Sequence, residues 1–501
     1  MDLCTNFPMF SIILCLMCGV VCSVLKKNMA RYVTYGLLTV LVVLSAAVLG
    51  YTVSIDGSFI YQMGHFGAPF GNELRAGVLE GVFTVFFSVI MYLSVIAGEK
   101  HIYEDVEESK INLYYTLICL MMSSLLALTY TNDVFTAYVF VEINTITAAG
   151  LVAVMGNGRA YFSSAKYMIM SLLGSGLLLI GITLLYDVTG HLLLSNIKYA
   201  VVNSTIKEYD EPFTIIIALI TIGLSIKSAL FPFHSWLPDA HTASTISSSA
   251  ILSSHVLKAY IILLIKIYYR AIGWETVLET GVNDIVFVFG IMAMIFGSVF
   301  AIAQKDVKRM TAYSSVAQIG YIFMGIGIGN AAGVVAAVFH IFAHGATKSM
   351  IFTSLGGIKE VSRHSTKLDA IKGAGYRNKV ASVAFAVGAF SMVGIPFFPG
   401  FVSKINFADA AIDAGGPKMI VILVALAVST VLNCIYFFRA LICLYTPVSD
   451  PGGRLTEEVD NTKPTAKYIG AMAFFIVANL FLGTFSDMII KLITRGLSMF
   501  S

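Results

Sequence analysis

The sequence predicts an all-α polytopic membrane protein, and two observations carry that prediction. First, 57% of the 501 residues are hydrophobic and only 12% are charged, whereas soluble domains carry about 25% charged residues. Second, apolar runs of about twenty residues, each long enough for one helical crossing of a bilayer, recur from end to end. A membrane β-barrel would alternate apolar and polar residues, and that alternation is missing.

The apolar runs predict about fourteen transmembrane helices. Their approximate ranges are 6–24, 32–53, 79–98, 111–130, 134–154, 166–187, 213–230 (continued by a short helix at 241–252), 255–270, 283–303, 309–327, 331–356, 380–395 (continued by 401–414), 417–445 and 468–490. The first run lacks the preceding basic segment and the small-residue cleavage site of a signal peptide, so we expect it to be helix one.

The placement of basic residues predicts the orientation. With the N-terminus outside, the cytoplasmic loops hold many basic residues, among them Lys26, Lys27, Arg31, Lys305, Lys308, Arg309, Lys359, Arg363, Lys367, Lys372, Arg377 and Lys379. The outer loops then hold Arg75, Lys198, Lys207, Arg270 and Lys418. This bias follows the positive-inside rule, so we expect a multi-pass protein of the cell inner membrane with its N-terminus outside. Because the basic residues line the membrane edge, the net charge of +3 does not indicate a nucleic-acid partner.

The polar connections are too short to form a soluble domain. The longest are 54–78, 188–212, 357–379 and 446–467, and none could bury a core of its own. We therefore expect no cofactor and no redox chemistry in this chain. The spacing of Cys15, Cys18 and Cys22 resembles a metal motif. All three lie inside the first apolar run without a nearby histidine or acid, so we expect packing residues and no metal.

Ionisable residues at membrane depth are the informative ones, because each costs several kcal/mol unless it is paired or hydrated. They are Glu142, Lys227, Lys258, Lys348 and Lys404, joined by His255, His340 and His344. Glu142 and Lys227 each sit within an apolar run, so we expect them to pair. The pair could be a static ion pair that fixes helix packing. A buried pair is rarely the best way to stabilise a fold, which favours a pair that opens and closes.

Two predicted helices are interrupted. In "LSIKSALFPFHSWLPDAHT" (224–242), Pro232 and Pro238 break the helix after Lys227 and enclose His234. In "GAFSMVGIPFFPGFVSKINFADAA" (388–411), Pro396 and Pro399 break a second helix before Lys404. Proline removes a backbone donor, and the freed backbone groups must line protein or a water-filled cavity.

Interrupted helices in corresponding halves are typical of internally repeated transporters. We therefore predict two inverted five-helix repeats, helices four to eight and nine to thirteen, with helices seven and twelve broken. The predicted divisions are 1–110 (helices one to three), 111–270 (first repeat), 283–445 (second repeat) and 446–501 (a cytoplasmic loop and helix fourteen).

Titratable side chains form stripes on two further helices. His340, His344 and Lys348 recur every four residues, so they lie on one helical face. His255 and Lys258 are three residues apart, and the hydroxyl-rich segment before them could hold a chain of water. Three aligned groups favour a proton wire over isolated core histidines. No carboxylate supports a metal site on the two histidines.

The segments "PFHSWLPDAHTASTISSSAIL", "KDVKRMTAYSSVAQIGYI" and "FHIFAHGATKSMIF" closely resemble signatures of the antiporter-like subunits of respiratory complex I, the Mrp sodium/proton antiporter and membrane-bound hydrogenases. The resemblance spans roughly 110–440 and implies fourteen helices with two inverted repeats. It also implies working residues: Glu142 of helix five, Lys227 of helix seven, Lys258 of helix eight, His340 and His344 of helix eleven, and Lys404 of helix twelve. Lys404 in place of glutamate, together with the lack of a long C-terminal lateral helix, makes the chain most similar to the D-type Mrp subunit. The segment "GIPFFPGF" departs from the adjacent prolines that are more frequent in this family.

The resemblance implies an ion-translocating subunit that does no redox chemistry itself, within an oxidoreductase or antiporter complex. A proton would reach Lys227 or Lys258 from the cytoplasm, pass by water and His340/His344 to Lys404, and leave outside. The Glu142–Lys227 pair would act as the gate, because a charge pair at 4 Å is worth about 4 kcal/mol at an effective dielectric of about 20. The implied partners are other membrane subunits, a peripheral ferredoxin- or NADH-linked redox module and the lipid bilayer. The alternatives are a stand-alone secondary transporter of a small solute and a structural subunit with a vestigial channel.

Overall fold

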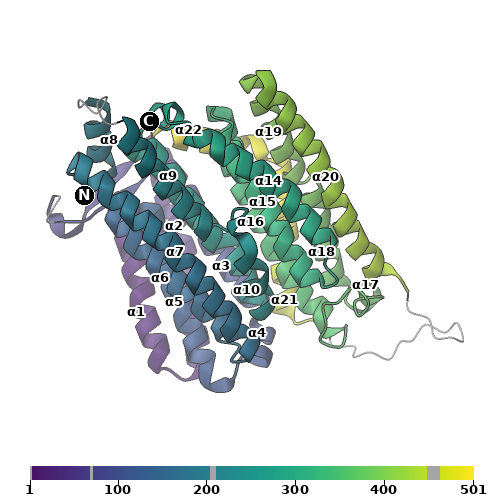
Figure 1. Cartoon of the computed structure of the whole chain (residues 1–501). Coiled ribbons are helices and arrows are strands. Elements are labelled where there is room, and N and C mark those ends of the chain that lie inside the picture. The colour runs from purple at the N-terminus through teal and green to yellow at the C-terminus, as the bar shows by residue number, and fades with distance from the viewer. Residues whose placement is uncertain (1–2, 68–70, 204–209, 448–462, 501) are drawn as a thin grey trace, which may run out of the picture.

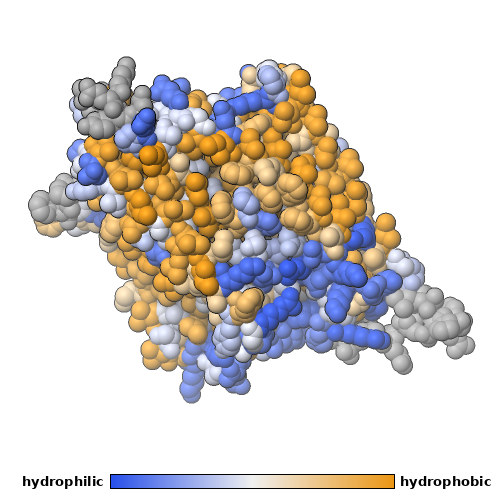
Figure 2. Space-filling model, viewed as in Figure 1, coloured by the Kyte–Doolittle hydropathy of each residue, from blue (hydrophilic) through white to orange (hydrophobic). Residues whose placement is uncertain are grey.

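The computed structural model describes residues 3–67, 71–203, 210–447 and 463–500. Helices make up almost all of this part and run side by side as one bundle (Figure 1). Eleven helices of the described residues are long and apolar enough to cross a membrane. Hydrophobic side chains cover the middle of the surface, and hydrophilic ones gather toward the lower end of the view (Figure 2). The polytopic all-α class is therefore confirmed.

The N-terminal part contains three long helices and a small hairpin that the sequence pattern did not predict. Its elements are η1 (Leu3–Asn6), α1 (Phe7–Val24), α2 (Lys27–Ser54), β1 (Phe59–Gln62), η2 (Met63–His65), β2 (Glu73–Ala76), α3 (Val78–Ala97), α4 (Glu99–Asp105) and η3 (Glu108–Lys110). The two strands are antiparallel, with Phe59 opposite Ala76. Of the three cysteines of α1, Cys15 and Cys22 are buried, and Cys22 Sγ lies 3.6 Å from the carbonyl oxygen of Ala30 on α2.

The first predicted repeat forms three helices, an interrupted fourth and a fifth. Its elements are α5 (Ile111–Tyr130), α6 (Val134–Ala153), α7 (Gly158–Thr189), α8 (Leu194–Asn203), α9 (Asp210–Lys227), η5 (Phe233–Trp236), α10 (Leu237–Ala243), α11 (Ile246–Ile251), the π-helical η6 (Leu252–Val256), α12 (Leu257–Lys266) and the π-helical η7 (Ile267–Ile272). The expected short continuation at 241–252 is wrong. The chain breaks at Ser244, and α11 continues through η6 into α12 as one span, Ile246–Ile272.

The second predicted repeat also contains three long helices, an interrupted helix and a further long helix. The remaining elements of the chain are α13 (Trp274–Glu279), α14 (Val282–Ile302), α15 (Val307–Gly327), α16 (Ala331–Glu360), α17 (Ala374–Arg377), α18 (Lys379–Val393), α19 (Pro399–Ala414), α20 (Gly416–Tyr445), α21 (Ala466–Thr484) and α22 (Ser486–Ser498). The expected helix fourteen is shorter than predicted, because the chain ends α21 at Thr484 and starts the separate helix α22. Part of the predicted loop 446–467 lies outside the described residues.

The count of about fourteen spans and the division into inverted repeats stay predictions. Three expected spans miss the criteria of length and hydropathy, namely α9, α15 and the pair α18/α19. α9 has charged residues at both ends, and α18 and α19 are the short halves of an interrupted helix.

Asparagine and aspartate fix where several helices begin. Asp133 accepts a hydrogen bond from the Thr136 amide at 2.6 Å, and Asn330 accepts one from the Gly333 amide at 2.8 Å. Asn157 and Asp306 cap α7 and α15 in the same way. Such caps satisfy amides that have no partner within the helix.

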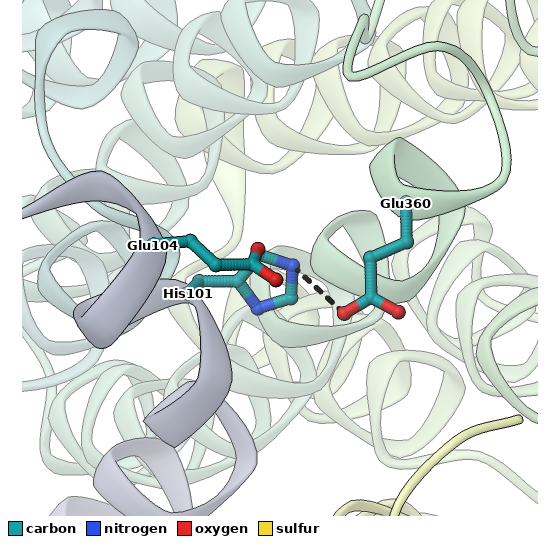
Figure 3. Close-up of side chains that lie close together, drawn as sticks. All are labelled: His101, Glu104 and Glu360. Carbon is teal, nitrogen blue, oxygen red and sulfur yellow. Dashed lines mark ion pairs between the residues drawn. The ribbon is translucent and has the colours of Figure 1, made fainter. Parts of the chain in front are cut away.

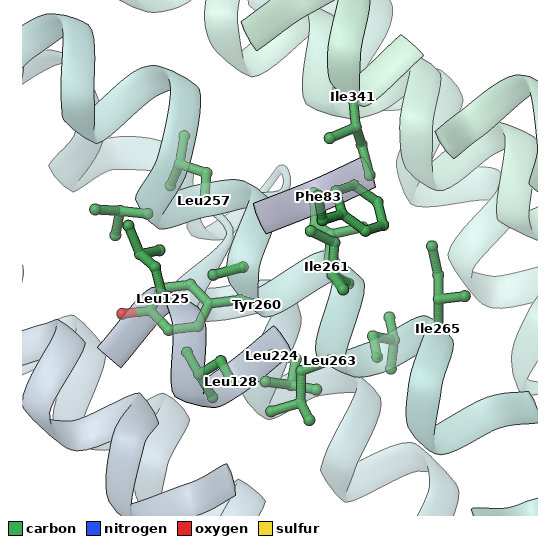
Figure 4. Packing of buried hydrophobic residues seen from close by; sticks show 14 of the residues in the cluster. Phe83, Leu125, Leu128, Leu224, Leu257, Tyr260, Ile261, Leu263, Ile265 and Ile341 are labelled. Carbon is green, nitrogen blue, oxygen red and sulfur yellow. The ribbon is translucent and has the colours of Figure 1, made fainter. Parts of the chain in front are cut away.

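The core of the bundle surrounds two spans, Ile246–Ile272 and α16. Within their most apolar windows, 100% and 94% of the residues are buried, against 33% for α1. Around α12, the side chains of Leu257, Tyr260 and Ile261 interdigitate with Leu125 of α5 and Phe83 of α3 (Figure 4). Titratable residues on these two spans therefore face protein and not lipid.

Candidate functional site

The first interruption lies just after Lys227, the last residue of α9. Ala229 takes a left-handed conformation with φ +57°, and the chain then enters η5 at Pro232. Trp236 Nε1 donates to the freed carbonyl of Ile226 at 3.3 Å. Of the two predicted breaking prolines, only Pro232 lies in the interruption. Pro238 sits in the first turn of α10, where its missing amide costs nothing.

Glu142 of α6 and Lys227 form the predicted pair. Lys227 Nζ lies 3.3 Å from Glu142 Oε1 and donates to Thr145 Oγ1 at 2.8 Å. Ser175 of α7 donates to the same carboxylate oxygen. Lys227 was expected in the middle of its helix. It lies instead at the C-terminal end of a half-helix, where the negative end of the helix dipole favours an ammonium group.

Hydroxyl groups connect the Glu142–Lys227 pair to α12. Thr145 Oγ1 lies 3.2 Å from the Tyr260 hydroxyl, and Lys227 Nζ lies 5.5 Å from the centroid of the Tyr260 ring. Tyr260 is two residues from Lys258, whose ammonium group donates to the carbonyl of Ser253 at 2.5 Å. That carbonyl belongs to the π-helical segment η6, a type of irregularity frequent at functional sites.

His255 is held by its own partners. Its Nδ1 lies 2.6 Å from Ser254 Oγ and its Nε2 lies 3.0 Å from the carbonyl oxygen of Phe87 on α3. His234 lies in η5 with its ring stacked on Phe231 and Phe300. We expected His234 and His255 to support the proton route. Each is held by the partners just named, and within the residues that the structure describes neither is hydrogen-bonded to one of the buried lysines.

On α16, the stripe of His340, His344 and Lys348 is buried along its whole length. The two imidazole rings are parallel, with centroids 5.9 Å apart. His340 Nδ1 lies 2.7 Å from Ser403 Oγ on α19, and Lys348 donates to the Thr311 carbonyl on α15 at 2.9 Å and to Ser314. Within the described part of the chain, neither ring nitrogen of His344 has a hydrogen-bond partner.

The second interruption places Lys404 against the end of α18. Gly394 ends that helix with φ +92°, Pro396 lies in the gap, and Pro399 is the first residue of α19. Lys404 Nζ donates to the Val393 carbonyl at 2.5 Å and to Thr430 Oγ1 at 2.9 Å. Its ammonium group also lies 6.0 Å from the Tyr321 ring centroid, and Tyr321 stacks on His340.

These groups form one connected set across the interior. The charges of Lys258 and Lys404 interact with that of His340. The charges of Lys258 and Lys348 interact with that of His344. Among the described residues none of Lys258, Lys348 and Lys404 forms an ion pair. Like charges buried near one another disfavour one another, so protonating every member of the set would be costly.

Two members of this set were not among the predicted site residues. His241 of α10 is fully buried, stacks on Phe352 at 4.7 Å and interacts electrostatically with Lys308 and His344. Lys308 was counted as a loop charge, yet it is buried and donates to the Ser244 carbonyl at 2.5 Å. His241 lies in the segment 224–242 quoted above, close after Pro238. Its position near a helix break could therefore have identified it as a site residue. For Lys308 no signal distinguished it from its basic neighbours.

The comparisons with known proteins identify the family of the chain. The family model described as "NADH:quinone oxidoreductase/Mrp antiporter, TM" matches residues 131–432. The chain belongs to this family. The matched range contains every central residue from Glu142 to Lys404, and the expected superfamily is thereby confirmed.

Individual relatives of the NADH:quinone oxidoreductase/Mrp antiporter family span most of the chain. The chain is 31% identical over 404 residues to NADH-quinone oxidoreductase subunit N of Desulforudis audaxviator, covering 80% of this chain and 78% of the relative. It is 28% identical over 423 residues to the putative antiporter subunit mnhA2 of Staphylococcus aureus, covering 80% of this chain and 51% of that relative. The finer likeness to a D-type Mrp subunit stays a prediction.

Solved structures share the fold. A chain of the membrane-bound sulfane sulfur reductase, described as an archaeal respiratory membrane complex, superposes with a TM-score of 0.87 at 24% identity, covering 100% of this chain and 98% of that chain. A chain of the Mrp complex from Dietzia sp. DQ12-45-1b superposes with a TM-score of 0.86 at 21% identity, covering 99% and 97%.

Proposed function

We propose that the chain moves protons across the cell inner membrane as one subunit of a multi-subunit complex. The observation that carries this proposal is the connected, buried set of amines and imidazoles between Lys308 and Lys404. Ionisable groups at membrane depth mark ion pathways, and a set with vacant sites can pass a proton from one member to the next.

The proposed route follows the electrostatic neighbours named above. A proton is taken up near Lys308 and His241, reaches Lys258 and His344, and passes along His340 to Lys404, which releases it on the far side. Hydroxyl groups and water complete the steps between side chains.

Lys227 and Glu142 act as the gate of the route. When the carboxylate is near, the ammonium form of Lys227 is stabilised; when the pair opens, Lys227 gives up its proton to the Thr145–Tyr260 side. An interaction of about 4 kcal/mol suffices for such a switch.

A partner subunit covers Glu142. Although Lys227 is fully buried, the Glu142 side chain is 25% exposed on a surface where Ile146 and Leu172 are also exposed. An ionised carboxylate facing lipid is costly, so we infer that another membrane subunit packs against α6 and α7 and moves this charge. A ferredoxin- or NADH-linked redox module, or a sodium gradient, supplies the driving force.

The distribution of basic residues supports an orientation with the N-terminus outside. Lys359, Lys372 and Arg377 lie at the end of the bundle that bears α4 and α17, which we assign to the cytoplasm. Arg270, counted above as an outer charge, is buried and lies 3.3 Å from Glu80, so the outer loops are even less basic than the sequence suggested.

The test is proton flux in vesicles that contain the complete complex. We expect Lys404→Ala to abolish pumping while the complex still assembles, and Lys418→Ala, at an exposed lysine, to leave pumping unchanged. Retained pumping in Lys404→Ala would instead support a structural subunit with a vestigial channel. Solute transport by the purified chain alone would support the stand-alone transporter. Repeating the assay with an imposed sodium gradient identifies the coupled ion.

A further inference from the structure

Three side chains that are far apart in the sequence meet at the end of the bundle that bears α4. His101 and Glu104 are three residues apart and share one face of α4, and Glu360 is the last residue of α16 (Figure 3). One ligand atom from each can be chosen so that all three lie within 4.8 Å of one another. None of these residues belongs to the proton route proposed above.

His101 is buried without hydrogen bonds. Its side chain is 2% exposed, and neither ring nitrogen has a hydrogen-bond partner among the described residues. Its Nε2 points at Glu360 and lies 3.3 Å from Oε1 (Figure 3). This contact is an ion pair only when the ring is protonated. Buried polar atoms are nearly always satisfied, and a metal ion shared with Glu360 would satisfy Nε2 of the neutral ring.

A cavity of about 280 Å³ adjoins two of the three residues, His101 and Glu360. His101 and Glu360 line it together with Asn378 and Tyr468. It has room for the water molecules that would complete a coordination shell.

Lys100 is the cation present at these carboxylates. Its Nζ lies 3.1 Å from Glu360 Oε2 and 3.7 Å from Glu104 Oε1. Lys100 and Glu104 are each 39% exposed, so both can turn. An incoming metal ion can therefore displace the ammonium group and draw Glu104 inward.

We propose that His101, Glu104 and Glu360 form a binding site for a divalent transition-metal ion. One imidazole nitrogen with two carboxylates suits Zn²⁺, which binds nitrogen at about 2.0–2.1 Å and carboxylate oxygen at about 2.0–2.2 Å. Ca²⁺ and Mg²⁺ prefer ligand sets made of oxygen alone. A bound ion would tie α4 to the end of α16, the helix that carries His340, His344 and Lys348.

The first test measures Zn²⁺ binding to the purified, metal-stripped complex by calorimetry. We expect His101→Gln and Glu360→Gln each to raise the dissociation constant of one class of Zn²⁺ site at least tenfold. His191→Gln removes an exposed histidine elsewhere and should change nothing. Lys100→Gln should tighten binding about threefold, because it removes the competing cation. Wild-type binding in both His101→Gln and Glu360→Gln would overturn the proposal.

A second measurement covers the case in which the His101 variant does not fold. Glu104→Gln changes a half-exposed residue and should also weaken binding. Co²⁺ added to the wild-type complex should show the visible absorption of a tetrahedral or five-coordinate nitrogen–oxygen site. A spectrum of six-coordinate aqueous Co²⁺ would count against the site.

The link to function is tested separately. Resting on the proton route proposed above, we expect Zn²⁺ to slow proton flux in the wild-type complex and to slow it less in His101→Gln. Binding is measured without flux, so the two proposals can fail independently. A complex that binds Zn²⁺ at these residues but moves no protons would refute the function and leave the site intact.

Discussion

The two interrupted helices hold the same kind of side chain in different electrostatic surroundings. Lys227 has a carboxylate 3.3 Å away, supplied by Glu142 from another helix. Lys404 has two neutral partners, the Val393 carbonyl and the Thr430 hydroxyl, and forms no ion pair among the described residues. Both ammonium groups lie at the C-terminal end of a half-helix, which favours their charge. In the proposed route, Lys227 would be switched by moving the carboxylate of Glu142, whereas Lys404 would keep its neutral partners and respond to the protons that reach it.

The backbones of the two interruptions differ as well. The left-handed residue after α9 is Ala229, and the one after α18 is Gly394. A Cβ at Gly394 would lie 3.0 Å from Lys404 Cδ and 3.1 Å from its Nζ. A side chain at Gly394 would thus crowd the flexible end of Lys404 in a conformation that side chains rarely adopt. The second interruption nevertheless holds one such residue, Phe397 with φ +74°, as the first holds Ala229.

Placing a carboxylate beside Lys404 should have the largest effect on proton flux. We expect Thr430→Glu to hold the proton on Lys404 and to lower flux by a factor on the order of 1,000, which corresponds to the interaction of about 4 kcal/mol. Thr430→Gln has the same shape without the charge and should lower flux far less. Equal flux in the two variants would show that the missing acid does not matter. The measurement is proton flux in vesicles of the complete complex.

Removing the carboxylate beside Lys227 should have the second largest effect. Glu142→Gln leaves Lys227 buried and unpaired, and we expect it to lower both flux and thermal stability. Breaking a fully buried pair costs about 3–5 kcal/mol, and the partial exposure of Glu142 should reduce that cost. The double variant Glu142→Gln/Lys227→Met should regain stability but not flux. Additive melting shifts would mean that the two residues do not interact.

Exchanging the left-handed residues should change stability with opposite sign. Gly394→Ala adds a strained conformation costing about 1–2 kcal/mol and a contact with Lys404. Ala229→Gly relieves the same strain, partly offset by the entropy of glycine, and should stabilise the protein by about 0.5 kcal/mol. Melting of the two purified variants in one detergent checks the signs. A shift in the same direction for both would contradict the described backbone.

The smallest effect is expected at an exposed pair outside both interruptions. Lys418 Nζ lies 2.5 Å from Asp284 Oδ1 on the surface. Asp284→Asn should change the free energy of unfolding by at most about 0.5 kcal/mol and leave flux unchanged. A loss of flux here would indicate that the assay responds to any altered charge.

The sequence predicted the features that are local in the chain. Charges within apolar runs identified Lys227, Lys258 and Lys404, and four-residue spacing identified the stripe on α16. Features that depend on distant contacts could not be predicted. Ser403 reaches His340 from another helix. Lys308 is buried, whereas its basic neighbours Lys305 and Arg309 are exposed and half-buried. The hairpin of β1 and β2 is too short for its alternation to stand out.

The π-helical segment η6 contains more residues than an α-helix joining the same two ends would need. Deleting one residue within η6 would therefore let a regular α-helix join the same two ends, and Lys258 and Tyr260 could keep their neighbours. Each residue of an α-helix turns the chain by about 100°, so the same deletion in the regular helix α12 would rotate everything beyond it. The surplus residue of the bulge thus makes this part of the span tolerant of a one-residue deletion, whereas the regular helix that follows is not.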